Sequence, residues 1–238
     1  MKLFENLDTN GVERTEDRVA TSASYLLDSD IYVATIKAAY TGESKSGALS
    51  ITLMCDIDGK DYRETIYITN RNKQPYSVNT TTHKKSFIPG YNYMNAICLV
   101  AAGKELKGVD TEEKVLSLYN FETQKNENTS VPVLVDLTGK QVALGIIKEL
   151  RNKAELVDGK YVDTPESREQ NKITAVFDPE SHKTVNEALD GKEATFWDAW
   201  LERNKGKVVD RRTIKDAAPN TGSGAANTPA PRKSLFNK

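Results

Sequence analysis

The clearest structural signal in the chain is residues 48–70, which read ALSITLMCDIDGKDYRETIYITN. In the first half, apolar and polar side chains alternate with a period of two, which is typical of a β-strand with one buried face. Asp58-Gly59 follows and is a strong signal for a tight hairpin turn. The second half alternates again, with Tyr62 on the apolar face and Arg63 and Tyr67 on the polar face. The stretch therefore predicts a β-hairpin that buries one face.

The chain on either side of this hairpin predicts a larger β structure. Residues 31–40 are rich in β-formers and complete an antiparallel meander over 31–70. Further elements are expected in order: a polar loop at 71–90, a helix at 91–102 with Gly103 as its C-cap, strands at 131–138, 140–150 and 172–178, and an amphipathic helix at 192–204. A five-strand meander with a helix between the third and fourth strands is typical of an OB-fold barrel. The expected fold class is mainly β with accessory helices, an OB-fold-like barrel with a helical C-terminal extension and a disordered tail.

Length and composition bound the class of protein. The chain has 238 residues, of which 38% are hydrophobic and 28% charged, a profile typical of a soluble globular protein. It contains no apolar run near the ~20 residues that span a bilayer and no apolar segment near Met1. Two cysteines, Cys55 and Cys98, fit a reduced compartment. We therefore expect a cytoplasmic protein.

Charge is unevenly distributed although the net charge is −1. Residues 1–30 carry a net charge of −4, residues 31–107 carry +4, and residues 216–238 carry +2. A local patch of charge, rather than the total, is what a polyanion meets within a Debye length of roughly 10 Å. The pattern predicts an acidic N-terminal segment (1–30), a binding domain (31–215) and a tail (216–238).

The tail has the composition of a linker with a docking peptide at its end. Residues 217–231 are only Ala, Pro, Asn, Thr, Gly and Ser, which predicts a flexible linker. Its tip combines basic and apolar residues and is the candidate partner-binding site: Arg232, Lys233, Leu235, Phe236 and Lys238.

Catalytic and metal-binding motifs are missing from the sequence. His83 and His182 lie in no motif with a nucleophile or paired carboxylates, and no glycine loop for phosphate is present. The cysteines and histidines lack the spacing of metal ligands. Residues 56–61 are better explained by the hairpin turn than by a calcium loop. We expect no enzymatic activity, no metal and no cofactor.

Residues 60–95 carry a signal for single-stranded nucleic acid. They hold six of the chain's 18 aromatic residues and six basic residues against two acidic ones. Cations of this kind follow a phosphate backbone, and exposed rings stack on unpaired bases at ~1–3 kcal/mol per base. The candidate DNA-binding residues are Arg63, Tyr67, Arg71, Lys73, Tyr76, Lys84, Lys85, Phe87 and Tyr91. Lys148, Arg151 and Lys153 could extend this patch, whereas Tyr62, Trp197 and Trp200 are expected in the core.

Three short strings add a resemblance to a known family. They are Ile66-Tyr67-Ile68-Thr69-Asn70, Phe87-Ile88-Pro89-Gly90-Tyr91-Asn92 and Val133-Leu134-Val135-Asp136-Leu137. Over roughly residues 30–215 the chain resembles the single-stranded DNA-binding proteins of virulent podophages, in the enquatrovirus-like (schitovirus) group. The resemblance implies an OB-fold protein that coats single-stranded DNA during phage DNA replication and recombination in the infected host cell. It also implies transcription activation, with host RNA polymerase or phage replication proteins as partners of the C-terminus.

The composition of the tail keeps an alternative open. Many replication-type single-strand binders end in an acidic tail that competes with DNA, but this tail has no acidic residue beyond Asp216. A basic tail cannot compete with DNA by charge. The rival hypothesis is a protein-interaction scaffold that binds no nucleic acid and docks a partner through its tail.

Overall fold

The computed structural model describes residues 26–120, 123–157 and 160–214. This part of the chain is mainly β with a few short helices, so the predicted class is confirmed at that level. The elements in order are β1 (Asp30–Glu43), β2 (Leu49–Ile57), β3 (Lys60–Tyr67), β4 (Tyr76–Val78), β5 (Lys85–Phe87), α1 (Pro89–Ala102), η1 (Leu106–Gly108), β6 (Thr111–Asn120), β7 (Lys125–Leu134), η2 (Val135–Leu137), β8 (Gln141–Val157), β9 (Lys160–Phe177), α2 (Val185–Leu189), α3 (Thr195–Asn204) and β10 (Val208–Asp210). The predicted tail, 216–238, and residues 1–25 of the acidic segment lie outside the described residues.

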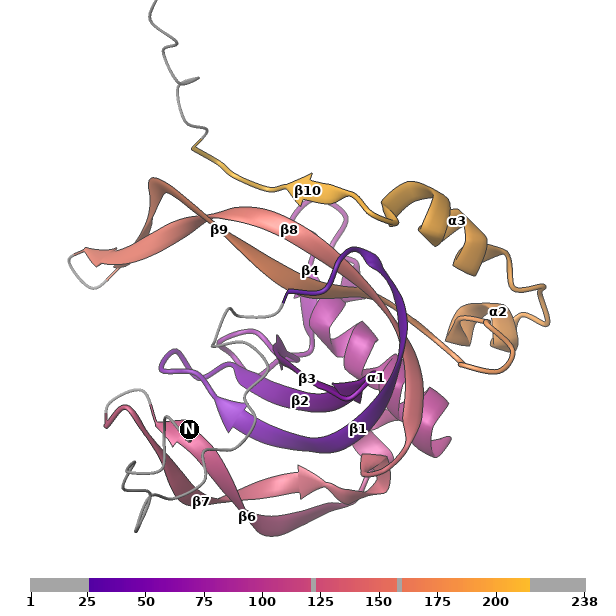
Figure 1. Ribbon diagram of the computed structural model, residues 1–238, viewed down its shortest axis with the longest axis horizontal. Coiled ribbons are helices and arrows are strands. Elements are labelled where there is room, and N and C mark those ends of the chain that lie inside the picture. The colour runs from indigo at the N-terminus through magenta and orange to yellow at the C-terminus, as the bar shows by residue number, and fades with distance from the viewer. Residues whose placement is uncertain (1–25, 121–122, 158–159, 215–238) are drawn as a thin grey trace, which may run out of the picture.

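One eight-stranded sheet forms the body of the protein, along the hydrogen-bonded path β10-β8-β1-β2-β3. Strand β1 pairs with two strands over different parts of its length: residues 30–35 pair with β8 and residues 35–43 pair with β2. Strand β9 pairs with β8, and the β6–β7 hairpin joins β1 through β7. The sheet curls so that the β8–β9 ribbon passes over β1, β2 and β3 (Figure 1). Among the described residues no backbone ladder joins β3 to β9, so the sheet is not closed into a barrel.

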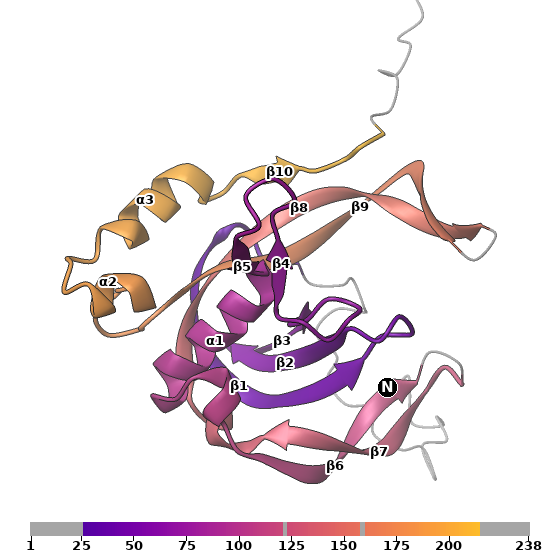
Figure 2. The same cartoon turned by 180° about the vertical axis from the view of Figure 1, so that it is seen from behind.

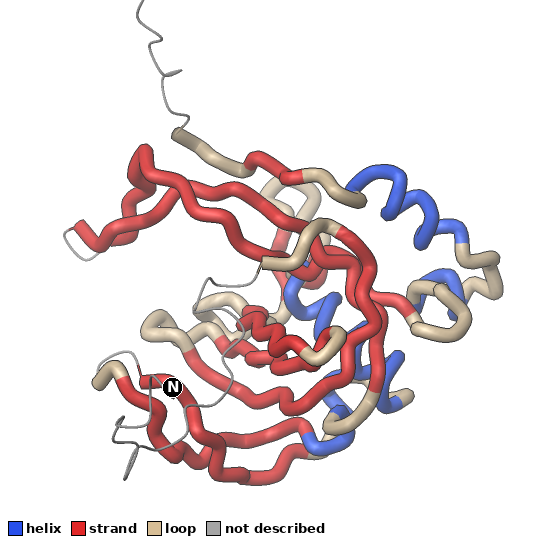
Figure 3. Tube along the Cα trace, in the orientation of Figure 1, coloured by secondary structure: helices blue, strands red, loops and turns tan. Residues whose placement is uncertain are grey.

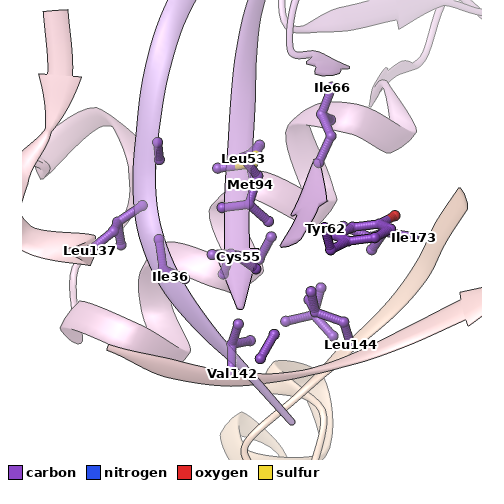
Figure 4. Packing of buried hydrophobic residues seen from close by; sticks show 14 of the residues in the cluster. Ile36, Leu53, Cys55, Tyr62, Ile66, Met94, Leu137, Val142, Leu144 and Ile173 are labelled. Carbon is purple, nitrogen blue, oxygen red and sulfur yellow. The ribbon is translucent and has the colours of Figure 1, made fainter. Parts of the chain in front are cut away.

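The predicted alternation is confirmed along β3, whereas in β2 the predicted polar-face residues Ser50 and Thr52 are also buried. Leu53 and Cys55 of β2 are buried, and the β3 side chain of Tyr62 is only 8% exposed. Tyr67, on the opposite face of β3, is 52% exposed. Figure 4 shows the inner face packed against Met94 of α1. Burial of one strand face against a helix supplies the main stabilisation of such a body.

Helix α1 ends where the sequence predicts and begins two residues earlier than expected, at Pro89. Pro89 occupies its first turn, where a missing N–H costs nothing, and Gly103 ends it in the left-handed conformation at φ 65°. Gly90 is required by close approach, since a Cβ there would lie 2.0 Å from the Tyr67 carbonyl oxygen. This contact seats the start of α1 against the end of β3.

The C-terminal elements pack onto the outer face of the sheet. Trp200 of α3 is buried over Gly145 of β8, which confirms its predicted place in the core. Trp197 is half-buried and stacks on His182 with ring centroids 4.0 Å apart. Strand β10 then adds in parallel to β8. The helical extension is therefore part of one body with the sheet (Figure 1).

Three regions differ from the sequence-based expectation. The expected strand at 131–138 is instead β7, which ends at Leu134 and turns through η2 so that Leu137 enters the core. Strands β8 and β9 run far beyond the predicted 140–150 and 172–178. The expected loop at 71–90 contains the β4–β5 hairpin. Figure 3 shows that the β6–β7 and β8–β9 ribbons extend on one side of the molecule, with α2 and α3 on the other.

None of the helices in the described ranges has both the length and the apolar content needed to cross a membrane. The longest is α1, with 14 residues.

Candidate nucleic-acid interface

Four of the candidate residues gather where the β4–β5 hairpin meets α1. Tyr76 and Phe87 are paired across the hairpin, and the Phe87 ring stacks on Tyr91 with centroids 4.7 Å apart and planes 22° apart. The Lys85 ammonium lies 4.7 Å from the centroid of the Tyr76 ring, within cation–π range. We call Tyr76, Lys85, Phe87 and Tyr91 the aromatic surface. Figure 2 shows the hairpin standing in front of α1 when the molecule is seen from behind.

The aromatic surface presents its rings to solvent to different degrees. Phe87 is 54% exposed, whereas Tyr76 and Tyr91 are half-buried. Phenylalanine has no hydroxyl that water can hydrate. The exposed part of the Phe87 ring is therefore apolar surface that a ligand could cover. Because Phe87 already stacks on Tyr91 on one side, its position in the hairpin is fixed by packing.

Tyr67 adjoins this surface through the backbone. It ends β3, and its carbonyl oxygen lies against Gly90, the residue before Tyr91. Its side chain is on the exposed face of the strand, as the period-two pattern predicts. Asn70 further ties the intervening loop to the hairpin by donating to the Tyr76 carbonyl at 3.3 Å. The end of β3 and the aromatic surface are therefore held together by local contacts.

The cations around these rings differ in how far they are neutralised. Arg71 and Lys84 are exposed and form no ion pair within the part of the chain that the structure describes. Lys73 lies 3.2 Å from a Glu43 carboxylate oxygen, so part of its charge is already compensated. Unpaired cations are the ones that gain most from a phosphate, because no existing partner is lost.

Arg63 lies apart from the aromatic surface and is held by a tyrosine that sequence reasoning missed. Its Nη2 donates to the Tyr40 hydroxyl at 2.6 Å, and the guanidinium carbon lies 5.9 Å from the Tyr40 ring centroid. Both residues belong to the outer face of β1, β2 and β3. The register that pairs Tyr40 with Thr52, and Thr52 with Thr65, places them there. Only the strand register, not the spacing in sequence, brings this pair together.

Two further residues at this end of the sheet were not predicted. Val78 lies on the same hairpin and is exposed. Lys45 lies in the β1–β2 turn and has no ion pair in the described chain. That turn reaches the Arg71 loop, because a Cβ on Gly47 would lie 3.2 Å from the Arg71 carbonyl oxygen. Lys45 therefore adds a positive charge near Arg71, and this proximity cannot be predicted from the composition of residues 60–95.

The cations of β8 that could extend the patch already have carboxylate partners. Lys148, Arg151 and Lys153 are paired with carboxylates at 3.2, 2.6 and 2.7 Å respectively. Their partners come from the same ribbon, since Glu169 and Glu166 lie on β9 and Glu149 lies on β8. These cations stabilise the ribbon locally and contribute little net positive charge.

The structure brings no group of three or more His, Cys, Asp or Glu side chains into position for a metal ion within the ranges it describes. Burial raises the pKa of both Cys55 and Cys98 to about 12, so each is a neutral thiol near pH 7. Both cysteines belong to the apolar core.

The candidate residues of the tail tip, Arg232, Lys233, Leu235, Phe236 and Lys238, lie outside the described residues. The nine candidates in the body fall into three groups: the aromatic surface with Tyr67, the loop cations Arg71, Lys73 and Lys84, and the separate pair of Arg63 with Tyr40. In comparison with known proteins, no family model and no curated protein matches the chain.

Proposed function

We propose that this protein binds single-stranded DNA without sequence preference, through the aromatic surface, Tyr67 and the neighbouring cations. The observation that carries the proposal is the stacking of Phe87, on the β4–β5 hairpin, against Tyr91 of α1. Arg71 lies in the loop before this hairpin and Lys84 in the loop that connects its strands, and neither cation has an ion pair in the described chain. Rings offer a π-face to any base, and cations follow the backbone, so neither contact reads sequence.

The strand order supports an OB-like frame for this activity. Strands β1, β2, β3, β8 and β9 form an antiparallel series in which α1 follows the third strand. In OB-folds the face of the second and third strands, with adjacent loops, binds oligonucleotides. Here β3, which pairs with β2, carries Arg63 and Tyr67 on its exposed face. The gap between β3 and β9 is bridged by a side chain, Glu64, which accepts from the Ile173 N–H at 2.8 Å.

The magnitudes expected from this site are moderate. Each base stacked on an aromatic ring contributes ~1–3 kcal/mol. Contact with about three to five phosphates gives a slope of log K against log salt between about −2 and −3.5 for a single strand. The lower figure corresponds to Arg71, Lys84 and Lys85, and the higher one adds Arg63 and Lys73.

A fluorescence anisotropy titration tests the proposal. A labelled strand of about 30 nucleotides, longer than the ≈ 4–16 nucleotides that one OB fold covers, would be titrated at two salt concentrations with duplex DNA as competitor. We expect salt-sensitive binding that duplex does not displace, and weaker binding by Phe87→Ala. Tyr119→Ala is the matched control, because Tyr119 is an exposed ring on β6, outside the proposed site. An affinity for the strand that does not change with salt, or an equal loss of affinity in Phe87→Ala and Tyr119→Ala, would refute the proposal.

We further infer, from the resemblance given above, a role in phage DNA replication or recombination, with the tail tip recruiting host RNA polymerase or a phage replication protein. Deleting residues 232–238 should then leave DNA affinity largely intact while abolishing partner recruitment. If the same deletion removed all detectable binding, or if the intact protein bound no DNA at low salt, the scaffold alternative would replace this function.

A further inference from the structure

The tip of the β8–β9 ribbon exposes an unusual amount of apolar surface. Leu156 and Tyr161 face each other across the ribbon and are 63% and 78% exposed. Val157 and Val162, on the other face of the ribbon, are also exposed. A two-stranded ribbon that leaves the body gains little from its own packing, so apolar residues at its end are costly without a partner. Glu155, directly across from Val162, adds a carboxylate that forms no ion pair with the side chains that the structure describes.

A second site with complementary properties lies at the base of the same ribbon. A cavity of about 370 Å³ opens between α3 and β10 over the outer face of β8 and β9. We call it the α3–β10 groove. Its apolar lining includes Ile147, Phe196 and Val209, and its cationic side chains are Arg203 and Arg211. Neither arginine side chain forms an ion pair within the part of the chain that the structure describes.

The two sites match in chemistry but cannot meet within one molecule. The tip supplies apolar side chains and the carboxylate of Glu155, and the groove supplies an apolar cavity and two guanidinium groups. Ile147, in the groove, and Leu156, at the tip, belong to the same strand. At ~3.3 Å per residue they lie about 30 Å apart along an extended strand, so the tip cannot fold back into its own groove.

We propose that the ribbon tip of one copy docks in the α3–β10 groove of a second copy. The contact joins two different surfaces, so each added copy still presents one tip and one groove, and assembly runs head to tail. A single hairpin tip in one groove is a small interface, in the class of weak and transient contacts below about 1,200 Å². We expect a dissociation constant of about 1–100 μM for each contact.

Sedimentation velocity of the full chain without DNA tests this proposal over a range of protein concentrations. The weight-average sedimentation coefficient of the intact protein should rise with concentration. It should stay at the monomer value for the tip variant Tyr161→Ser and for the groove variant Arg203→Glu/Arg211→Glu. Val115→Ser is the matched control, since Val115 is an equally exposed apolar residue on the other ribbon, and this variant should assemble like the intact protein.

Mixing the two variants gives the decisive measurement. The tip variant retains a groove and the groove variant retains a tip, so an equimolar mixture should form one-to-one dimers and stop there. Circular dichroism would verify that each variant is folded, as expected for exposed positions. An intact protein that remains monomeric to about 100 μM would overturn the proposal, given the affinity stated above. So would assembly by the groove variant alone, which would indicate tip-to-tip pairing. Because DNA is absent, this result is independent of the proposed DNA binding.

Discussion

Replacing Glu64 by alanine should weaken the join between β3 and β9. The Glu64 side chain is 9% exposed and accepts hydrogen bonds from the Tyr62 hydroxyl at 2.7 Å and the Ile173 N–H at 2.8 Å. The Lys172 ammonium donates to its other oxygen at 2.5 Å. Burial and the charge of Glu64 raise the pKa of Tyr62 well above its ordinary value, so Tyr62 remains a donor. One carboxylate thus replaces the backbone ladder that these strands lack.

The expected cost follows from the groups that lose their partner. The Glu64→Ala variant leaves the Tyr62 hydroxyl and the Ile173 N–H buried without an acceptor, at ~1–3 kcal/mol each. Lys172 is about one-third exposed and can turn to water, so its contribution is close to that of a surface ion pair, ~0–1 kcal/mol. Removing a buried charge returns part of this cost. We expect a net destabilisation of about 2–4 kcal/mol, which corresponds to a Tm lower by about 5–15 °C for a chain of this size.

Differential scanning calorimetry and hydrogen exchange would measure this effect. The Ile173 amide should exchange faster in Glu64→Ala than in the intact protein. Glu64→Gln keeps one acceptor oxygen and should fall between the two. Glu166→Gln is a control, because its ion pair with Lys153 is exposed and its loss should not move Tm measurably. A Tm within about 2 °C of the intact protein for Glu64→Ala would refute the reasoning, since it corresponds to less than about 1 kcal/mol.

Three further predictions follow from single side chains. Gly145→Ala places a Cβ 2.9 Å from the indole ring that packs over it, and this overpacking should cost ~1–3 kcal/mol and alter tryptophan fluorescence. Tyr67→Ala should weaken single-strand binding by ~1–3 kcal/mol with little change in Tm, whereas Tyr62→Ala should lower stability by ~3–5 kcal/mol; the reverse pattern would show that the proposed DNA face is wrong. Because burial raises the pKa of Cys55 and Cys98 to about 12, both thiols should react with a thiol reagent only on unfolding, and rapid labelling of the native protein at pH 8 would contradict their burial.

Local patterns in the sequence predict the β1–β2–β3 meander and α1 well. In β3 the alternation reports directly on burial, whereas in β2 both faces are largely buried. Gly103 ends α1 in the conformation that glycine favours. Strand β6 and the first part of β7 were missed because their pairing is carried by backbone hydrogen bonds between largely exposed residues. Such a ribbon leaves no apolar period to detect.

The sequence identified most of the candidate residues, but it did not predict how they are arranged in space. The residues between 60 and 95 were found by composition, but the stacking of Phe87 on Tyr91 depends on a short hairpin that reads as a polar loop. The Arg63–Tyr40 contact depends on strand register, and the pairing of Lys148 depends on β9. Contacts between residues far apart in sequence are set by tertiary packing, which one sequence does not display.

The double pairing of β1 has a consequence for the order in which the chain folds. Its second half can pair with β2 as soon as residues 30–57 have left the ribosome, but its first half must wait for β8. The segment before β1 waits longer still, because Ser29 donates to the Lys207 carbonyl and Leu27 donates to Asn171. These links join residues separated by 178 and 144 positions. Long loops of this kind slow folding. The nascent protein therefore carries one edge of β1 unsatisfied through most of its synthesis, and that edge is where premature association between chains would begin.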